Sequence, residues 1–250
     1  MKKHREIERP TLGTLAFTSY VFGPLTDYDK SLKKFRDEVN GSLDLGREDH
    51  RLALFDWLNK WGCRLPLASR AAACRQIGAW YEEHAALLPS GSDRLSQLSA
   101  KSLDAMGNVF SDLSERLIGG RANGGSRSLG STAASKTLYA LRPQVFMPWD
   151  GAMRAAFDCD GSGESYVRFL KLIREDLVRL DEEARRLDRS LPDLPAFFDQ
   201  SGRTPIDLIN QFYWLTITRR ATPPDESKLT KWLDLLKSRS MTIKGDTNKG

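Results

Sequence analysis

The chain has 250 residues, of which 40% are hydrophobic and 28% charged, and its formal net charge is +5. Such a chain is long enough to bury a core without disulfides or metal, and its positive charge mildly favours a polyanionic partner. Its three cysteines and three histidines are scattered, which excludes a disulfide framework and a four-cysteine iron–sulfur cluster and argues against a zinc site.

The N-terminal segment is charged rather than apolar, and no apolar run is long enough to span a bilayer. These features predict a cytoplasmic protein with no metal, no cofactor and no membrane partner. We expect a monomer.

Residues 1–24 are expected to be irregular, with a short strand or helical turn that Gly23 and Pro24 end. Hydrophobic spacing then predicts a series of helices, with starts at Asp27 or Asp29, at Ser69, and at Ser92 or Asp93. The expected helices of this half cover residues 27–39, 48–61, 69–88 and 92–117. At the end of the second of them, Asn59, Lys60 and Arg64 either face a cleft or simply match the helix dipole.

The segment 119–128 is rich in glycine and is expected to be a flexible linker or a loop that faces DNA. Further helices are predicted over residues 151–157, 164–187, 205–217 and 227–236, followed by a polar, disordered tail over 237–250. Because strand signals are scarce, the fold class is all-α. We expect one domain over 1–236, with two helical lobes around a cleft.

A tight glycine turn precedes a short helix at Gly130, Ser131 and Thr132. Glycine permits turns that other residues cannot make, and the amides of such a turn, with those of the following helix, can converge on a phosphate. The alternative is plain capping of the helix N-terminus.

Asp150 follows the almost wholly apolar segment 145–149. A carboxylate at the edge of such a segment loses hydration, which suits a group that acts on a substrate. The alternative is that Asp150 only caps the helix predicted over 151–157, and the two roles are compatible.

The two motifs together, residues 129–138 and 145–154, resemble the helix-hairpin-helix DNA glycosylase superfamily. That family shows a glycine hairpin, a helix carrying Ala and Lys, and a turn ending in an aspartate before a helix with an Arg. The resemblance covers residues 129–154, within the hairpin segment 129–157. It departs from the family at the hairpin, where Leu-Gly-Ser-Thr-Ala stands for the usual Leu-Pro-Gly-Val-Gly.

Lys136 lies near the lysine with which bifunctional members of that family form a Schiff base. Its spacing to Asp150 is several residues shorter than in those members, so we do not transfer the role. We expect Lys136 to contact a phosphate or to lie on a solvated helix face.

The resemblance implies a monofunctional glycosylase that hydrolyses the N-glycosidic bond of a flipped damaged or modified base and leaves an abasic site. Asp150 would be the catalytic carboxylate. Trp149 is the expected stacking residue, with Tyr20 and Phe22 at the edge of the base pocket; the alternative for Trp149 is a core position. Repair and the excision of modified bases from phage DNA in bacterial defence both fit this activity.

The implied partner is double-stranded DNA. The backbone contacts are expected from residues near the hairpin, namely Gly130, Ser131, Thr132, Lys136, Arg127 and Arg154. Two other functions remain open at this point: a non-catalytic helical DNA-binding module that retains the hairpin, and an interaction protein in which Asp150 only caps a helix.

Overall fold

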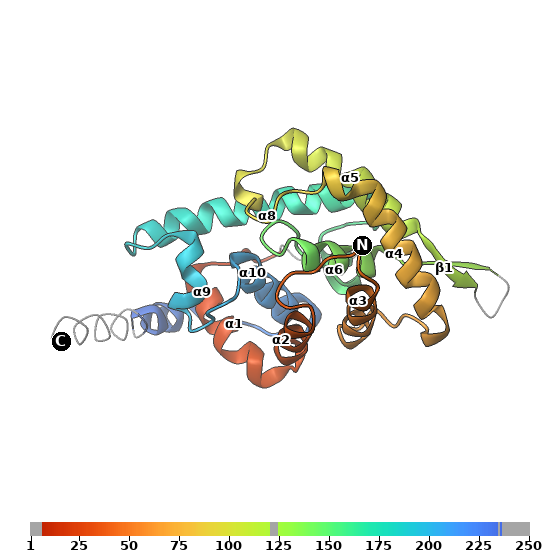
Figure 1. Ribbon diagram of the computed structural model, residues 1–250. Coiled ribbons are helices and arrows are strands. Elements are labelled where there is room, and N and C mark those ends of the chain that lie inside the picture. Colours follow the sequence, from red (N-terminus) through yellow and green to blue (C-terminus); the bar gives the residue numbers. More distant parts are fainter. Residues whose placement is uncertain (1–6, 121–124, 235, 237–250) are drawn as a thin grey trace, which may run out of the picture. The chain divides into compact units, whose positions relative to one another are not determined.

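The computed structural model describes residues 7–120, 125–234 and 236 (Figure 1). In these residues the chain is mostly helical and its only sheet has two strands, which confirms the all-α prediction. The chain divides into two compact units, Met1–Leu25 with Ile173–Gly250 (unit 1) and Thr26–Leu172 (unit 2). The tail predicted over 237–250 lies outside the described residues.

The irregular segment predicted at the N-terminus is wrong, because α1 runs over Leu12–Leu25 and includes Gly23 and Pro24. The helix starts with a reciprocal pair of bonds between Thr11 and Thr14, in which each hydroxyl accepts from the backbone N–H of the other residue. Apolar residues lie all around α1, so its sequence shows no helical period.

Unit 1 is completed by the last part of a long helix and by elements from the C-terminal third of the chain. In chain order these are α8 (Gly163–Arg185), η4 (Leu191–Asp193), α9 (Leu194–Phe197), α10 (Pro205–Tyr213), the π-helical η5 (Trp214–Thr218) and a helix over 226–234. The predicted start at Pro205 is confirmed, with Thr204 as its cap. Helix α1 packs against α10 (Figure 1).

A fully buried carboxylate, Asp176, connects the segments of unit 1. It accepts hydrogen bonds from Arg9 Nε at 2.6 Å, from the Tyr213 hydroxyl at 2.7 Å and from Arg179 at 3.1 Å. A buried charge needs such donors to offset its desolvation. The three donors come from the N-terminal segment, α10 and α8, so this network joins Arg9 to two helices of the C-terminal part of the chain.

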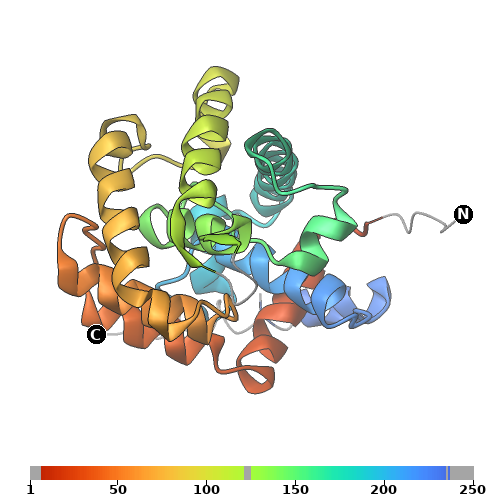
Figure 2. The same cartoon turned by 90° about the vertical axis from the view of Figure 1, so that its right-hand side faces the viewer.

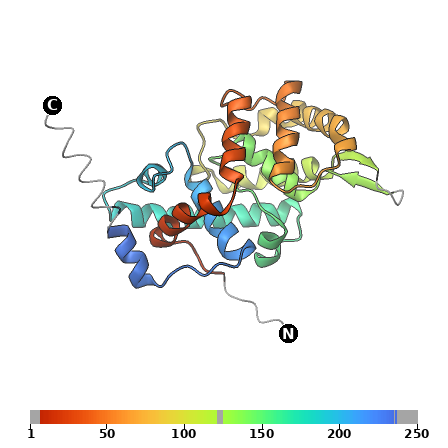
Figure 3. The same cartoon turned by 90° about the horizontal axis from the view of Figure 1, so that it is seen from below.

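Unit 2 contains the helices of the middle of the chain, of which α2 and α3 lie side by side (Figure 3), as do α4 and α5 (Figure 2). Its elements are α2 (Tyr28–Glu38), α3 (Glu48–Lys60), η1 (Leu67–Ser69), α4 (Arg70–His84), η2 (Ala85–Leu87), η3 (Leu95–Gln97), α5 (Ala100–Glu115), β1 (Leu117–Gly120), β2 (Ser126–Ser128), α6 (Ser131–Leu141), α7 (Gly151–Ala156) and the first part of α8. The start predicted at Ser92 or Asp93 is wrong: α5 begins after Ser99, whose hydroxyl accepts from the Ser102 amide.

The described parts of the glycine-rich segment belong to two antiparallel strands that form a β-hairpin, with Leu117 paired to Ser128, while residues 121–124 lie outside the described residues. The fully buried Ile118 anchors its first strand. After the hairpin the chain returns to the end of α5, because Leu129 N–H donates to the Arg116 carbonyl and Gly130 N–H to the Ser114 carbonyl. Helices α5 and α6 pack together, so the β-hairpin is an insertion between two adjoining helices.

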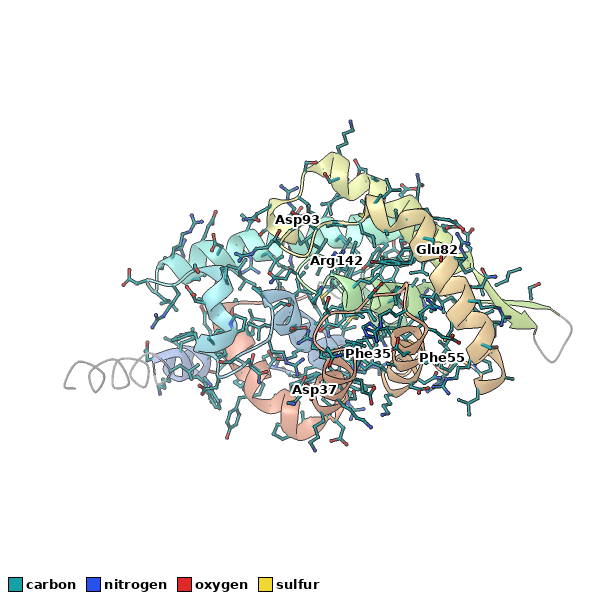
Figure 4. The ribbon with its side chains drawn as sticks, in the orientation of Figure 1. Phe35, Asp37, Phe55, Glu82, Asp93 and Arg142 are labelled. Carbon is teal, nitrogen blue, oxygen red and sulfur yellow. The ribbon has the colours of Figure 1, made fainter. Side chains whose placement is uncertain are left out.

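Helix α6 is the central helix of unit 2, and nearly every residue from Ala133 to Leu141 is buried. On one side Tyr139 stacks on Trp57 and Trp61, and Phe35 (labelled in Figure 4) stacks on Trp57 at 5.0 Å. On the other side the N-terminal turn of α6 contacts the segment that leads to Asp150. Helix α6 therefore contacts both the aromatic cluster and the segment before Asp150.

Candidate functional site

The apolar segment before Asp150 is fixed by hydrogen bonds to buried partners. The indole Nε1 of Trp149 donates to the Ser131 carbonyl at 3.0 Å, and the Trp149 amide donates to the Ser135 hydroxyl at 3.2 Å. The Tyr166 hydroxyl donates to the Met147 carbonyl at 3.0 Å. Because buried polar groups are costly to leave without a partner, these bonds define the position of the chain just before Asp150.

Asp150 is half-buried at the N-cap of α7, as the capping alternative predicted. Its Oδ1 accepts from the Met153 amide at 2.8 Å, and its extended backbone is typical of an N-cap. The capping role is therefore present. It leaves the carboxylate at the edge of the protein, immediately after a residue that is itself immobilised, which is compatible with a second, catalytic role.

Trp149 belongs to the core, so the expectation that it stacks on a flipped base is corrected. Trp149 is 1% exposed. The centre of its ring lies 4.8 Å from the ring centre of Tyr166, 5.4 Å from that of Phe169 and 5.6 Å from that of Phe110. All faces are used by these aromatic neighbours and by the bond to Ser131. The role of Trp149 is to hold the chain before Asp150.

The expectation that Lys136 contacts a phosphate or lies on a solvated face is also wrong. Lys136 is 8% exposed, and its Nζ donates a short hydrogen bond to the Trp61 carbonyl at the end of α3. The Nζ also lies 5.8 Å from the centre of the Trp61 ring. A cation at a helix C-terminus interacts favourably with the helix dipole, which explains this buried position.

Lys136, Cys63 and Asp150 interact electrostatically. Burial lowers the pKa of Lys136, and the nearby Cys63 and Asp150 partly oppose that shift. Burial raises the pKa of the Cys63 thiol, and Lys136 opposes that shift in turn. The structure thus gives Asp150 a buried amine as a neighbour, which spacing along the sequence did not establish.

The lowered pKa of Lys136 leads to a test by pH. The unfolded chain keeps this proton to higher pH than the folded one, so the Lys136 contribution to the free energy of unfolding increases between the two pKa values. We expect wild type to gain stability relative to Lys136→Met by up to about 1.4 kcal/mol per pH unit in that window. Urea unfolding of both proteins from neutral to alkaline pH measures this difference.

The Trp61 carbonyl that Lys136→Met leaves without its donor adds an offset that does not depend on pH. Lys101→Met, at an exposed position of α5, is the control and should show no such gain. A difference between wild type and Lys136→Met that stays flat or shrinks as the pH rises would contradict the buried position of the amine.

The structure brings Ser131 and Arg154 together at the N-terminus of α6. A Cβ built on Gly161 would meet Arg154 Nη1 at 2.8 Å and the Ser131 hydroxyl at 3.1 Å, so the missing side chain of Gly161 lets these two groups approach. Among the described residues, the buried Nε of Arg154 has no hydrogen-bond partner. A guanidinium beside the first amides of a helix has the charge and the donors to bind an anion.

The expected phosphate turn is corrected at Gly130. Its backbone has φ +84°, as a glycine turn requires, but its N–H donates to the Ser114 carbonyl and is therefore not directed at a phosphate. The half-buried Ser131 and Thr132 open the first turn of α6, which has no side-chain cap. Of the predicted residues, Ser131 and Arg154 are therefore the pair that the structure brings together, beside Gly161, whereas the Gly130 amide is already engaged.

The remaining predicted site residues are Arg127 in unit 2 and Phe22 and Tyr20 in unit 1. Arg127 is half-buried on β2, and its Nη2 donates to the Arg64 carbonyl at 3.4 Å. Phe22 is 3% exposed and packs on Trp214 in the core of unit 1, so its role at the edge of a pocket is corrected. Tyr20 is 68% exposed, beside Trp232, and its role in binding a base stays a prediction.

Among the described residues, one group of side chains has the spacing of metal ligands. It consists of Glu83, His84 and Asp112, whose ligand atoms lie within 4.8 Å of one another. The Arg116 guanidinium donates to both carboxylates, and His84 Nε2 lies 2.7 Å from Asp112 Oδ2. Burial alone would raise the pKa of Asp112, but these interactions together outweigh it and hold that pKa below its usual range. The cationic position is thus taken by Arg116, so the cluster is better described as an ion-pair network.

Sequence reasoning missed Trp61, Cys63 and Gly161 as neighbours of the predicted residues. Trp61 and Cys63 reach Lys136 across more than seventy positions of the chain, and helical periodicity carries no information at that range. For Gly161, the run of glycine and serine over 161–163 was a signal for a turn but not for its neighbours.

Across the part of the chain that the structure describes, no helix combines the length and the apolar character that crossing a membrane requires. Comparison of the chain with protein-family models, with curated proteins and with solved structures gave no match.

Proposed function

We propose that this chain is a monofunctional DNA glycosylase in which Asp150 is the catalytic carboxylate. The observation that supports the proposal is the half-buried Asp150, which follows the buried Trp149 and whose backbone carbonyl accepts from the amide of Arg154, the residue that meets Ser131 at Gly161. The resemblance of segments 129–138 and 145–154 to the helix-hairpin-helix glycosylases supports the same function.

In the proposed reaction the bond between the base and C1′ of the sugar breaks, and positive charge develops on the sugar. A fixed carboxylate stabilises this charge and accepts the proton of the water that attacks C1′. The base is reached only after its nucleotide leaves the duplex, and phosphate contacts hold the strand during that step. Ser131 and Arg154 supply donors for such a contact.

The proposal assigns no covalent step to Lys136. Its Nζ is buried, donates to the Trp61 carbonyl and lies 5.8 Å from the Trp61 ring centre, so it would have to leave these partners to attack a sugar. A monofunctional enzyme leaves an abasic site and an intact strand.

The test is incubation of the protein with labelled duplexes that each carry one damaged or hypermodified base. We expect at least one substrate to yield strand breaks only after alkali, and no protein–DNA adduct after borohydride, because no Schiff base forms. Breaks without alkali, together with a trapped adduct, would contradict the monofunctional mechanism.

A non-catalytic DNA-binding module is the second candidate. The observation that favours it is the engaged amide of Gly130, which removes one donor from the expected phosphate turn. Normal duplex binding without an abasic site from any substrate of the panel would support this module and reject the glycosylase.

A further inference from the structure

Two long segments of this chain contain no acidic residue. The whole chain has 33 Asp and Glu in 250 residues, or about one in eight, yet residues 57–81 and 116–149 have none. The two segments carry nine Lys and Arg between them. An acid-free distribution differs from the mixed charges of α8, where Arg179 pairs with Glu183 and Arg185 with Asp181.

The fold places the two acid-free segments against each other in unit 2. Helix α4 packs on β1, and a Cβ built on Gly119 would meet the Ser69 hydroxyl at 3.2 Å. Arg127 of β2 donates to the carbonyl of Arg64 at 3.4 Å. The segments are therefore neighbours in space as well as being alike in charge.

Only some of the nine cations are available to a partner. Arg116 is paired with Glu83 and Asp112, Arg70 is paired with Asp56, Lys136 is buried, and Arg142 donates to the carbonyls of Pro89 and Leu141. Lys60 and Arg64 are exposed and Arg127 is half-buried, and none of these three pairs with a carboxylate of the described residues. We call Lys60, Arg64 and Arg127 the basic hairpin surface.

The loop that carries Arg64 is held rigidly. The Asn59 side chain accepts from the Leu65 amide at 2.6 Å and donates to the Leu65 carbonyl at 3.2 Å. Arg64 itself has φ +53°, a conformation that costs energy for a residue with a Cβ. Because Asn59 bonds both the amide and the carbonyl of Leu65, the loop is ordered before binding, and Arg64 loses little conformational entropy when it contacts a partner.

We propose that the basic hairpin surface binds the phosphate backbone of duplex DNA, in addition to the contact at Ser131 and Arg154. Arginine binds phosphate through two parallel hydrogen bonds, and the two segments carry no carboxylate of their own that would repel the DNA backbone. The Trp61 carbonyl receives Lys136 from α6, so the loop with Arg64 is attached to the helix whose first turn faces Arg154.

Duplex DNA is favoured over other polyanions because Arg64 belongs to a hydrogen-bonded loop and Arg127 to a paired strand, so both are presented by ordered backbone. A flexible acidic polypeptide needs charge alone, whereas a duplex presents phosphates at regular intervals. The proposal shares its partner with the proposed glycosylase but needs no catalysis, so the two are tested separately.

The test compares Arg64→Gln/Arg127→Gln with wild type for binding of a short unmodified duplex, followed by fluorescence anisotropy over a series of salt concentrations. We expect the slope of log K against log salt to fall in magnitude by roughly 2 and the affinity to drop about tenfold or more at low salt. Arg47→Gln/Lys171→Gln is the matched control, because it removes two cations of the same unit that are paired with Asp49 and Asp104. Leu67→Ala, which removes an exposed side chain without charge, should leave the slope unchanged.

Three results would overturn the proposal. They are an unchanged slope in Arg64→Gln/Arg127→Gln, an equal loss in the paired-cation control, and displacement of the duplex by poly-glutamate at the same concentration of charge. Loss of excision with the slope intact would reject the glycosylase and not this surface. Excision with an unchanged slope in the double variant would reject the surface and leave the glycosylase.

Discussion

Asp150→Asn is expected to abolish base excision while the protein stays folded and binds DNA. The carboxylate is assigned two tasks in the reaction, stabilising the charged sugar and accepting a proton from water, and the amide can do neither. Removing a positioned general base lowers a rate by about 10²–10⁴-fold. Single-turnover excision with enzyme in excess over the susceptible duplex measures the chemical step apart from binding.

Asp150→Asn separates catalysis from stability because asparagine can still cap α7. Asp150 Oδ1 accepts from the Met153 amide, and the carbonyl oxygen of asparagine can accept the same bond. Asp150→Asn should therefore unfold at nearly the same urea concentration as wild type. Asp27→Asn removes one carboxylate at the N-cap of another helix of unit 2 and is the control for net charge.

The outcomes for Asp150→Asn separate the candidate functions. A rate within about threefold of wild type would mean that Asp150 only caps α7 and would reject its catalytic role, since losses to general-base removal are far larger. A lost rate with unchanged affinity for the duplex is the result expected of a catalytic carboxylate. Equal losses in Asp150→Asn and Asp27→Asn would point to charge rather than to chemistry.

Local patterns predicted the elements that face solvent on one side. Helices α2, α3 and α7 lie within a residue or two of their expected bounds, because each has a defined start and a glycine or an apolar segment that limits it. The buried α1 and the β-hairpin were missed. In α1 the apolar residues show no period, and in the hairpin Gly119 and Gly120, which suggested flexibility, pair with β2.

The sequence predicted where Asp150 lies relative to the helix that follows it. It did not predict which residues from other parts of the chain pack around the site. Asp150 is at a helix N-cap after an apolar segment, as its sequence context indicated. The burial of Lys136 against Trp61 and the approach of Arg154 to Ser131 depend on the packing of α3, α6 and the loop at Gly161. Such contacts are set by tertiary structure, about which a motif of thirty residues says little.

Trp149→Ala is expected to have the largest effect on stability of any change near the site. Truncation of a buried Trp to Ala costs about 3–5 kcal/mol, from lost burial and from the cavity that remains. Trp149→Phe keeps most of the ring but leaves the Ser131 carbonyl without its donor, a loss of about 1–3 kcal/mol. Urea unfolding of wild type and both variants gives the two differences.

Trp149→Phe also tests whether the hydrogen bond from the Trp149 indole positions Asp150. If the indole bond to Ser131 fixes the chain before Asp150, Trp149→Phe should slow single-turnover excision in the fully folded protein while its affinity for undamaged duplex is unchanged. Trp80→Phe is the matched control: Trp80 is equally buried in unit 2, but its indole donates to the Val109 carbonyl. That variant should lose similar stability and keep the rate.

A base-stacking Trp149 would behave differently. Its replacement by phenylalanine would preserve stability, since a residue that waits for a flipped base has a free face, and would weaken binding of the susceptible duplex more than of the undamaged one. The packing of Trp149 between Phe110, Tyr166 and Phe169 leaves no such face. Stability and selective binding therefore change in opposite ways under the two roles, and one set of variants decides between them.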